Sequence, residues 1–337
     1  MKSNIKALLA AAGLAAFAFS PADAFEGGVQ WQSKPGVFIG ASAGVPPPGI
    51  YMFDQVFTYQ TNVSGPVTSA IGTHNGVQAA VDIQGFVFVP GWTFLGATYD
   101  AVLAQPFGMV SVGRPLSDNP TQVDMFSGVH NTYIVPVELS WKFGTSGFAV
   151  KTGVGIYLPD GCTTGAAKLG CEANPYTTYQ PEAIISYLKD GWNLTAAFYE
   201  EFNTANRVTN YTTGDIFHAD ITATKTIGKW TFGPVAYYVA QVTDDKCPAS
   251  CVATGESLLG HSQRFSFWAA GALVGYDFGP ASFSVWATQE FNAKASNHFV
   301  AAGADPSLVA EGATVFATLS YRLWAPEAPV APAMYHK

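Results

Sequence analysis

Polar side chains recur at every second position in several parts of this 337-residue chain, and they are the residues that could do chemistry. Between residues 217 and 224, His218, Asp220, Thr222 and Thr224 alternate with four apolar residues. This period of two predicts an extended strand with one polar face and one apolar face. A histidine that shares a face with an aspartate can act as a proton-sensitive gate, or it can be a simple hydrogen-bonded wall residue.

Carboxylates dominate the polar faces of the other alternating segments. We expect these charged residues to point the same way as His218: Asp82, Asp100, Glu138, Lys142, Lys151, Glu182, Glu201, Asp220, Glu290 and Arg322. Four aromatic residues are expected on the same face: Tyr199, Tyr237, Trp268 and Trp286. Lining a lumen, the carboxylates would favour neutral or cationic solutes over anions, and the rings would guide flat apolar solutes. The alternative is that the charges pair with one another and the rings fill space.

The composition indicates what kind of protein carries these faces. Only 12% of the residues are charged and 48% are apolar, whereas ordinary soluble domains carry about 25% charged residues. Beyond the N-terminus no apolar run reaches 18 residues, which excludes transmembrane helices. A membrane β-barrel fits both facts, because its lipid-facing residues come at every second position. The formal net charge of −8 argues against nucleic acid as a partner.

The N-terminus predicts export. Lys2 and Lys6 precede an apolar run over 7–19 and a small-residue cleavage site, so residues 1–24 are expected to be a signal peptide cleaved after Ala24. Residues 25–48 show no strand pattern and are either a flexible lead or an ordered plug in the lumen. The tail over 325–337 is rich in proline and is expected to be disordered.

Twelve segments have the alternation and turn signals of strands. They lie near 49–60, 76–89, 92–105, 131–143, 147–157, 177–188, 192–202, 215–227, 230–242, 264–277, 282–293 and 313–324. Short turns, such as Pro90–Gly91 and Gly228–Lys229, alternate with long connections. This predicts an all-β fold, a transmembrane antiparallel up-and-down barrel of about 12 strands over 49–324, with both termini periplasmic. We expect a monomer in the bacterial outer membrane, with lipid and the barrel-assembly machinery as partners.

The lipid-facing side should be apolar, with aromatic residues near the membrane surfaces. In the segment 131–143, the alternation puts these residues outward: Tyr133, Val135, Val137, Leu139, Trp141 and Phe143. Five tryptophans near short turns or the end of the last strand predict an aromatic girdle: Trp92, Trp141, Trp192, Trp230 and Trp324. Gly153 and Gly155 mark either a kink in the wall or a position where glycine relieves crowding.

The four cysteines form two close pairs, Cys162 with Cys171 and Cys247 with Cys251. Both pairs fall in long connections, and in an exported protein they are expected to form two loop disulfides. The spacing leaves open a pairing between the two loops. It also leaves open a zinc site at Cys247 and Cys251, although no histidine cluster accompanies them.

Residues 178–245 resemble the transporter family of the phenol meta-cleavage pathway, whose members are often labelled phenol MetA-pathway degradation proteins. The N-terminal pattern is similar as well: FEGGVQ, then Pro35-Gly36, then PPPGIYMFDQVFTYQ. The resemblance covers 26–324. It implies an outer-membrane β-barrel that admits hydrophobic organic compounds, and it gives no role to individual residues.

We therefore expect a channel for passive uptake of small hydrophobic or aromatic compounds, such as the substrates of a phenol pathway. One alternative is a structural or adhesion barrel with a closed lumen. Another is an outer-membrane lipase, but the chain has no G-x-S-x-G motif and we do not expect an enzyme. No phosphate loop, dinucleotide fingerprint or metal motif is present, so no cofactor or metal is expected.

Overall fold

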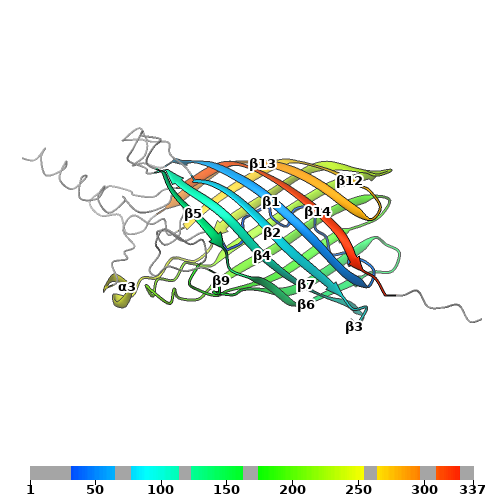
Figure 1. The fold of residues 1–337 in the computed structure, drawn as a ribbon, viewed down its shortest axis with the longest axis horizontal. Helices are drawn as coiled ribbons and strands as arrows, with labels where there is room; N and C mark the ends of the chain where they lie inside the picture. Colours follow the sequence, from blue (N-terminus) through cyan, green and yellow to red (C-terminus); the bar gives the residue numbers. More distant parts are fainter. Residues whose placement is uncertain are drawn as a thin grey trace, which may run out of the picture.

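Twelve long antiparallel strands close into a barrel (Figure 1). The structure is a computed structural model, and it describes residues 32–64, 77–113, 123–161, 174–253, 264–296 and 309–326. The predicted signal peptide, the pair Cys162 and Cys171, and most of the C-terminal tail lie outside the described residues. Among the residues described, no helix is long and apolar enough to cross a membrane.

Each barrel strand pairs with the next one along the chain. The strands are β1 (Gly49–Ser64), β2 (Val77–Val89), β4 (Ala97–Gly113), β6 (Tyr133–Lys142), β7 (Phe148–Tyr157), β8 (Thr178–Tyr187), β9 (Trp192–Asn203), β10 (Ile216–Ile227), β11 (Trp230–Gln241), β12 (Arg264–Asp277), β13 (Ala281–Ser296) and β14 (Val309–Trp324). The ring closes because β1 pairs with both β14 and β2. The predicted fold class is confirmed, since each predicted segment forms one wall strand. A wall with two unlike faces requires the period of two that the sequence shows.

Short turns and long connections lie at opposite ends of the barrel (Figure 1). The β6–β7, β8–β9, β10–β11 and β12–β13 turns gather at one end, where β1 starts and β14 ends. The described parts of the long connections lie at the other end, among them the short helix α3 (Ala249–Ala253). The alternation of connection lengths along the chain therefore predicts correctly which connections share an end.

Two connections differ from the prediction. The strand expected from residue 92 begins at Ala97, because the short β3 (Thr93–Phe94) folds back onto it through a tight turn at Leu95–Gly96. The long connection expected near 106–130 contains the outer part of β4 and a further strand, β5 (Val123–Val129). Because β5 and β6 pair with the same edge of β4 one after the other, β5 continues the wall in line with β6.

The outward face is apolar along most strands, as predicted. Large exposed apolar residues on this face include Phe86 and Phe88 on β2, Ile221 on β10 and Leu319 on β14. Four of the five girdle tryptophans are exposed near the end with the short turns: Trp92, Trp192, Trp230 and Trp324. Exposing so much apolar surface to water would be unfavourable, so this outer surface is suited to contact with lipid.

Strand β6 corrects one prediction. Tyr133 and Val135 are buried and face the lumen, although the alternation puts them outside. The pairing of β6 with β7 shifts register between Ile134 and Glu138, so the alternation changes phase within the strand. Pro136 lies in this irregular part, and a proline has no N–H to donate to a neighbouring strand. From Val137 onward the predicted phase holds.

Gly155 makes room for the inward-facing Tyr133. An ideal Cβ at Gly155 would lie 2.5 Å from the Tyr133 hydroxyl and ring, and one at Gly153 would lie 3.0 Å from atoms of Glu138 and Glu182. The register shift is on β6, whereas β7 pairs with β8 without interruption. Of the two interpretations of these glycines, relief of crowding is therefore the one that the geometry supports.

Candidate functional site: the barrel lumen

Residues 32–45, the lumen segment, lie inside the barrel and are held by side chains from several sides of the wall. The hydrogen bonds are Gly40 N to Thr222 Oγ1 (3.0 Å), Ala43 N to Ser186 Oγ (2.9 Å), Gln55 Nε2 to Val37 O (3.0 Å) and Trp286 Nε1 to Gly36 O (3.1 Å). The wall residues come from β10, β8, β1 and β13. The segment therefore crosses the lumen, which is the ordered alternative of the two that the sequence leaves open.

One buried ion pair fixes the start of this segment. Lys34 Nζ lies 2.8 Å from Glu290 Oε1, and both side chains are almost fully buried. The carboxylate also accepts hydrogen bonds from the hydroxyls of Tyr237 (2.6 Å) and Tyr59 (2.9 Å) and from the backbone N–H of Gly312 (2.9 Å). Lys34 Nζ lies 3.7 Å from the centroid of the Tyr59 ring, within cation–π range. Glu290 is thus the centre of a fully formed polar cage.

A second charged cluster lies between β4, β6, β7 and β8. Lys151 Nζ lies 2.6 Å from Glu138 Oε2 and 3.2 Å from Asp100 Oδ2. Glu182 adds a third buried carboxyl group, whose Oε1 has no hydrogen-bond partner among the described residues. Three carboxyl groups therefore face one ammonium group. Both interpretations of the inward charges therefore apply to this cluster. Lys151 pairs with two of the carboxyl groups, and the carboxyl groups still outnumber the ammonium group.

His218 pairs with Glu201 on the neighbouring strand. Its Nε2 lies 3.0 Å from Glu201 Oε1, but without the alignment of a hydrogen bond. The same oxygen accepts a hydrogen bond from Gln180 Nε2 at 3.3 Å. The carboxylate of Asp220 instead interacts with backbone amides of the lumen segment. His218 and Asp220 share a face, as the alternation predicts, but each has a different partner.

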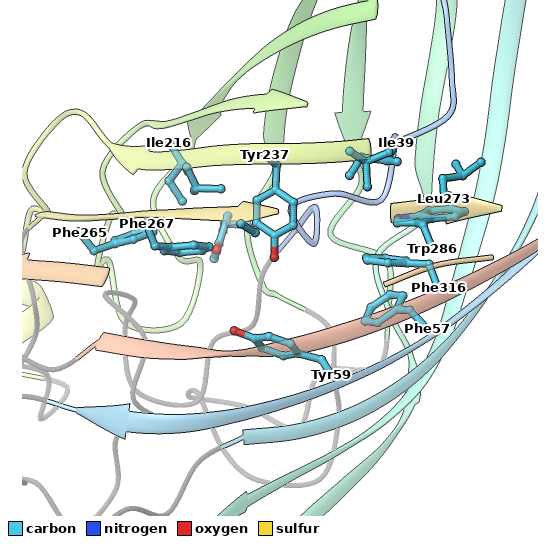
Figure 2. Packing of buried hydrophobic residues seen from close by; sticks show 14 residues of the cluster. Ile39, Phe57, Tyr59, Ile216, Tyr237, Phe265, Phe267, Leu273, Trp286 and Phe316 are labelled. Carbon is cyan, nitrogen blue, oxygen red and sulfur yellow. The ribbon is translucent and has the colours of Figure 1, made fainter. Parts of the chain in front are cut away.

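The apolar part of the lumen is packed as a protein core. Figure 2 shows Trp286, Phe316 and Phe57 beside Ile39 of the lumen segment. The Trp286 and Phe316 rings stack at 4.9 Å, and Phe316 lies 5.2 Å from Phe57. These rings come from β13, β14 and β1. They contact the segment rather than an open space, so the lumen is filled where they lie.

The structure brings most predicted lumen residues to the interior. The buried ones are Asp100, Glu138, Lys151, Glu182, Tyr199, Glu201, His218, Asp220, Thr222, Tyr237, Trp286 and Glu290. Arg322 follows the inward positions of β14 but is exposed near the end of that strand, at the mouth of the barrel with the short turns.

Two predicted lumen residues face outward. Asp82 alternates in phase with the exposed Phe86 and Phe88 on β2, and its partner in the pairing with β1 is the exposed Val56. Trp268 is 42% exposed, whereas its neighbour Phe267 is buried. Adjacent aromatic residues hide the phase of β12, because either one could be the inward residue. In β2, apolar residues lie on both faces around Asp82, so the sequence pattern does not predict which face this residue occupies.

Sequence reasoning missed Lys34 and Tyr59 as lumen residues. Lys34 contacts Glu290 across 256 positions of the chain, and no local period links them. The available signal was compositional, since Lys34 is the one charged residue of the glycine- and proline-rich sequence 27–48. Tyr59 follows the inward positions of β1 with Gln55 and Phe57, and that phase could have been found.

The described connections at the other end of the barrel contain a further buried carboxyl group. Asp245 accepts hydrogen bonds from Gly214 N (2.7 Å), Gln241 Nε2 (2.7 Å) and Tyr211 Oη (2.8 Å). Burial raises the pKa of Asp245 to about 7, against the opposing effect of these donors. The predicted disulfide between Cys247 and Cys251 is present close by. Within the described part of the chain, no group of three metal-ligating residues comes together.

Comparisons with known proteins identify one family by sequence and several solved structures with a similar fold. The sequence pattern of the family described as "Putative MetA-pathway of phenol degradation" matches residues 60–305. The COG4313 outer membrane channel from Pseudomonas putida F1 is 11% identical, with a TM-score of 0.63 over 86% of this chain and 99% of that one. The translocator domain of the autotransporter NalP from Neisseria meningitidis is 10% identical, with a TM-score of 0.46 over 82% and 89% of the two chains. No curated protein matches the sequence at a significant level.

Proposed function

The chain belongs to the family of the MetA pathway of phenol degradation, and from this premise we propose that it is an outer-membrane channel for passive uptake of small hydrophobic or aromatic compounds. The solutes would be of the kind that a phenol pathway consumes. The barrel would stand in the bacterial outer membrane as a monomer, after cleavage near Ala24 and insertion by the barrel-assembly machinery. Both termini would be periplasmic.

The observation that carries this proposal is the separate chain segment inside the barrel. A barrel that serves only as a scaffold can fill its interior with the side chains of its own wall. Here residues 32–45 fill part of it, held by hydrogen bonds and one ion pair. The wall therefore encloses more space than its own side chains occupy, and movement of the segment would free that space for a solute.

The polar groups around the segment suit neutral aromatic solutes. Buried carboxyl groups outnumber the buried cations of the lumen, which disfavours anions. Hydroxyl and amide groups such as those of Tyr199, Tyr237 and Gln180 lie beside stacked rings. A phenol needs one hydrogen-bond partner and an apolar surface for its ring, and this wall holds groups of both kinds, some of which are now bonded to one another.

Liposome swelling tests the proposal with phenol-like aromatics, sugars and anions of similar size. We expect the full chain to admit aromatics faster than sugars and anions, and a variant lacking residues 32–44 to admit all three classes faster. Heat-modifiable migration on a gel confirms that both proteins are folded barrels. No swelling with any solute, even after the deletion, would contradict the proposal and favour the closed structural barrel.

A further inference from the structure

The cage around Glu290 has the composition of a binding site for an organic cation. It consists of one carboxylate and two tyrosine rings, and the ammonium of Lys34 lies in it. Lys34 Nζ is 3.7 Å from the Tyr59 ring centroid and 5.6 Å from that of Tyr237. Aromatic faces around a carboxylate attract ammonium groups strongly when water is excluded.

The wall alone builds this cage. Glu290 lies on β13, Tyr59 on β1, Tyr237 on β11 and Gly312 on β14. The three hydrogen bonds to the carboxylate from Tyr59, Tyr237 and Gly312 do not involve the lumen segment. If the segment moves, the carboxylate stays in the same place and orientation, but it loses the cation that balances its charge. The three hydrogen bonds compensate part of the buried negative charge, and the part that remains attracts another cation into the emptied cage.

Lys34 indicates which cation fits. Its Nζ lies 2.8 Å from Glu290 Oε1, a distance at which the ammonium donates a charge-assisted hydrogen bond. A primary ammonium can donate in this way, but a quaternary ammonium has no N–H. Beyond Tyr237, the ring of Phe267 lies 6.3 Å away, and Phe265 stacks on Phe267 at 6.0 Å. An alkyl or aromatic tail attached to the ammonium would therefore find apolar surface next to the cage.

We propose that the Glu290 cage binds primary organic ammonium solutes with an apolar or aromatic tail, and that Lys34 occupies it as a competitor belonging to the chain. The proposal rests on the proposed function in one respect, since it takes the lumen to be a solute path. It extends the solutes of this path from neutral aromatics to aromatic and aliphatic amines. The glycine at position 36 supports it, because its positive φ of 84° and its close approach to the Tyr237 ring let the chain turn away directly after Lys34 enters the cage.

The test compares 2-phenylethylammonium with 2-phenylethanol, which has the same shape without the charge, on the full-length protein in planar bilayers. The measured quantity is the concentration of each compound that produces half of its effect on conductance. We expect this concentration to be about tenfold lower for the ammonium than for the alcohol. In Lys34→Ala it should fall by about a further tenfold, because the competing ammonium is removed. In Glu290→Gln the preference for the ammonium should disappear.

Lys225→Ala is the matched control. Lys225 also lies over an aromatic ring, that of Trp192 at 4.9 Å, but on the outer rim, so its removal should leave both concentrations unchanged. Tetramethylammonium, which has no N–H, should be at least as weak as the alcohol. Equal potency of ammonium and alcohol in the wild type would overturn the proposal, and so would an unaltered preference in Glu290→Gln. If either variant does not fold, the comparison of the two probes on the wild-type protein still decides.

Liposome swelling with phenol on the same preparation separates this proposal from the proposed function. Swelling with phenol, together with equal potency of the two probes, refutes the ammonium site alone. Absence of swelling refutes the channel. The ammonium site is then tested by the guanidinium midpoint of unfolding, which 2-phenylethylammonium should raise and 2-phenylethanol should not if the cage binds the ammonium.

Discussion

Glu290→Gln should be far more damaging than Lys34→Met, although the two residues form one ion pair. In Lys34→Met the carboxylate keeps three hydrogen bonds, from Tyr59, Tyr237 and Gly312. The lost cation–π contact and hydrogen bond should cost about 1–2 kcal/mol of unfolding free energy. In Glu290→Gln the buried ammonium of Lys34 loses its counter-ion. The new NH₂ group also replaces an oxygen that accepts hydrogen bonds, and it cannot accept from the donors around it. A buried charge left unpaired costs about 3–5 kcal/mol.

The lumen segment should nevertheless stay docked in Glu290→Gln. Four hydrogen bonds from the wall hold it between Gly36 and Ala43, and at about 0.5–1.5 kcal/mol each they contribute about 2–6 kcal/mol together. This is comparable with the cost of the substitution. We therefore expect lower stability and only a small rise in solute uptake, in contrast to the deletion of residues 32–44.

Equilibrium unfolding in guanidinium, followed by heat-modifiable migration, measures these costs for both single variants and for the double variant. In the double variant the unpaired charge is gone, so its cost should be smaller than the sum of the two single costs by about 2 kcal/mol or more. Equal costs for the two single variants, or additivity within about 0.5 kcal/mol, would refute the reasoning that Glu290 is the centre of the cage.

Three further predictions concern other parts of the barrel. Trp286→Ala should lower the unfolding free energy by about 3–5 kcal/mol, because it leaves a cavity beside Phe316; a guanidinium midpoint equal to that of the wild type would contradict this. Gly155→Ala should be destabilising by about 1–3 kcal/mol in the same assay, because its Cβ would collide with Tyr133, whereas the outward Val154→Ala should cost less. The raised pKa of Asp245, about 7 in the folded protein, means that the folded loops bind a proton more tightly than the unfolded chain does. Their docking should therefore weaken as pH rises from about 4 to about 7, by on the order of 4 kcal/mol, and Asp245→Asn should remove this dependence; limited proteolysis at pH 5 and pH 8 would detect both effects.

The sequence by itself determined the wall. In the stretch 217–224, His218, Asp220 and Thr222 are buried and Ile221 is exposed, as the alternation predicts. A strand side chain has only two directions, and in a chain with few charges the two faces differ strongly in polarity. Twelve strands, their end-to-end order and most of the inward carboxylates follow from this local rule. Cys247 and Cys251 pair as predicted because only three residues separate them in an exported chain.

The tertiary structure decided where the alternation changes phase and what fills the lumen. The register shift around Pro136 turns Tyr133 inward, and whether a proline produces such a shift depends on the strand beside it. The contacts of the lumen segment join Lys34 to Glu290 across 256 positions of the chain, and Ala43 to Ser186 across 143 positions. Such pairs are set by the closing of the ring, which brings distant strands around one short segment. No period or spacing within a single segment contains that information.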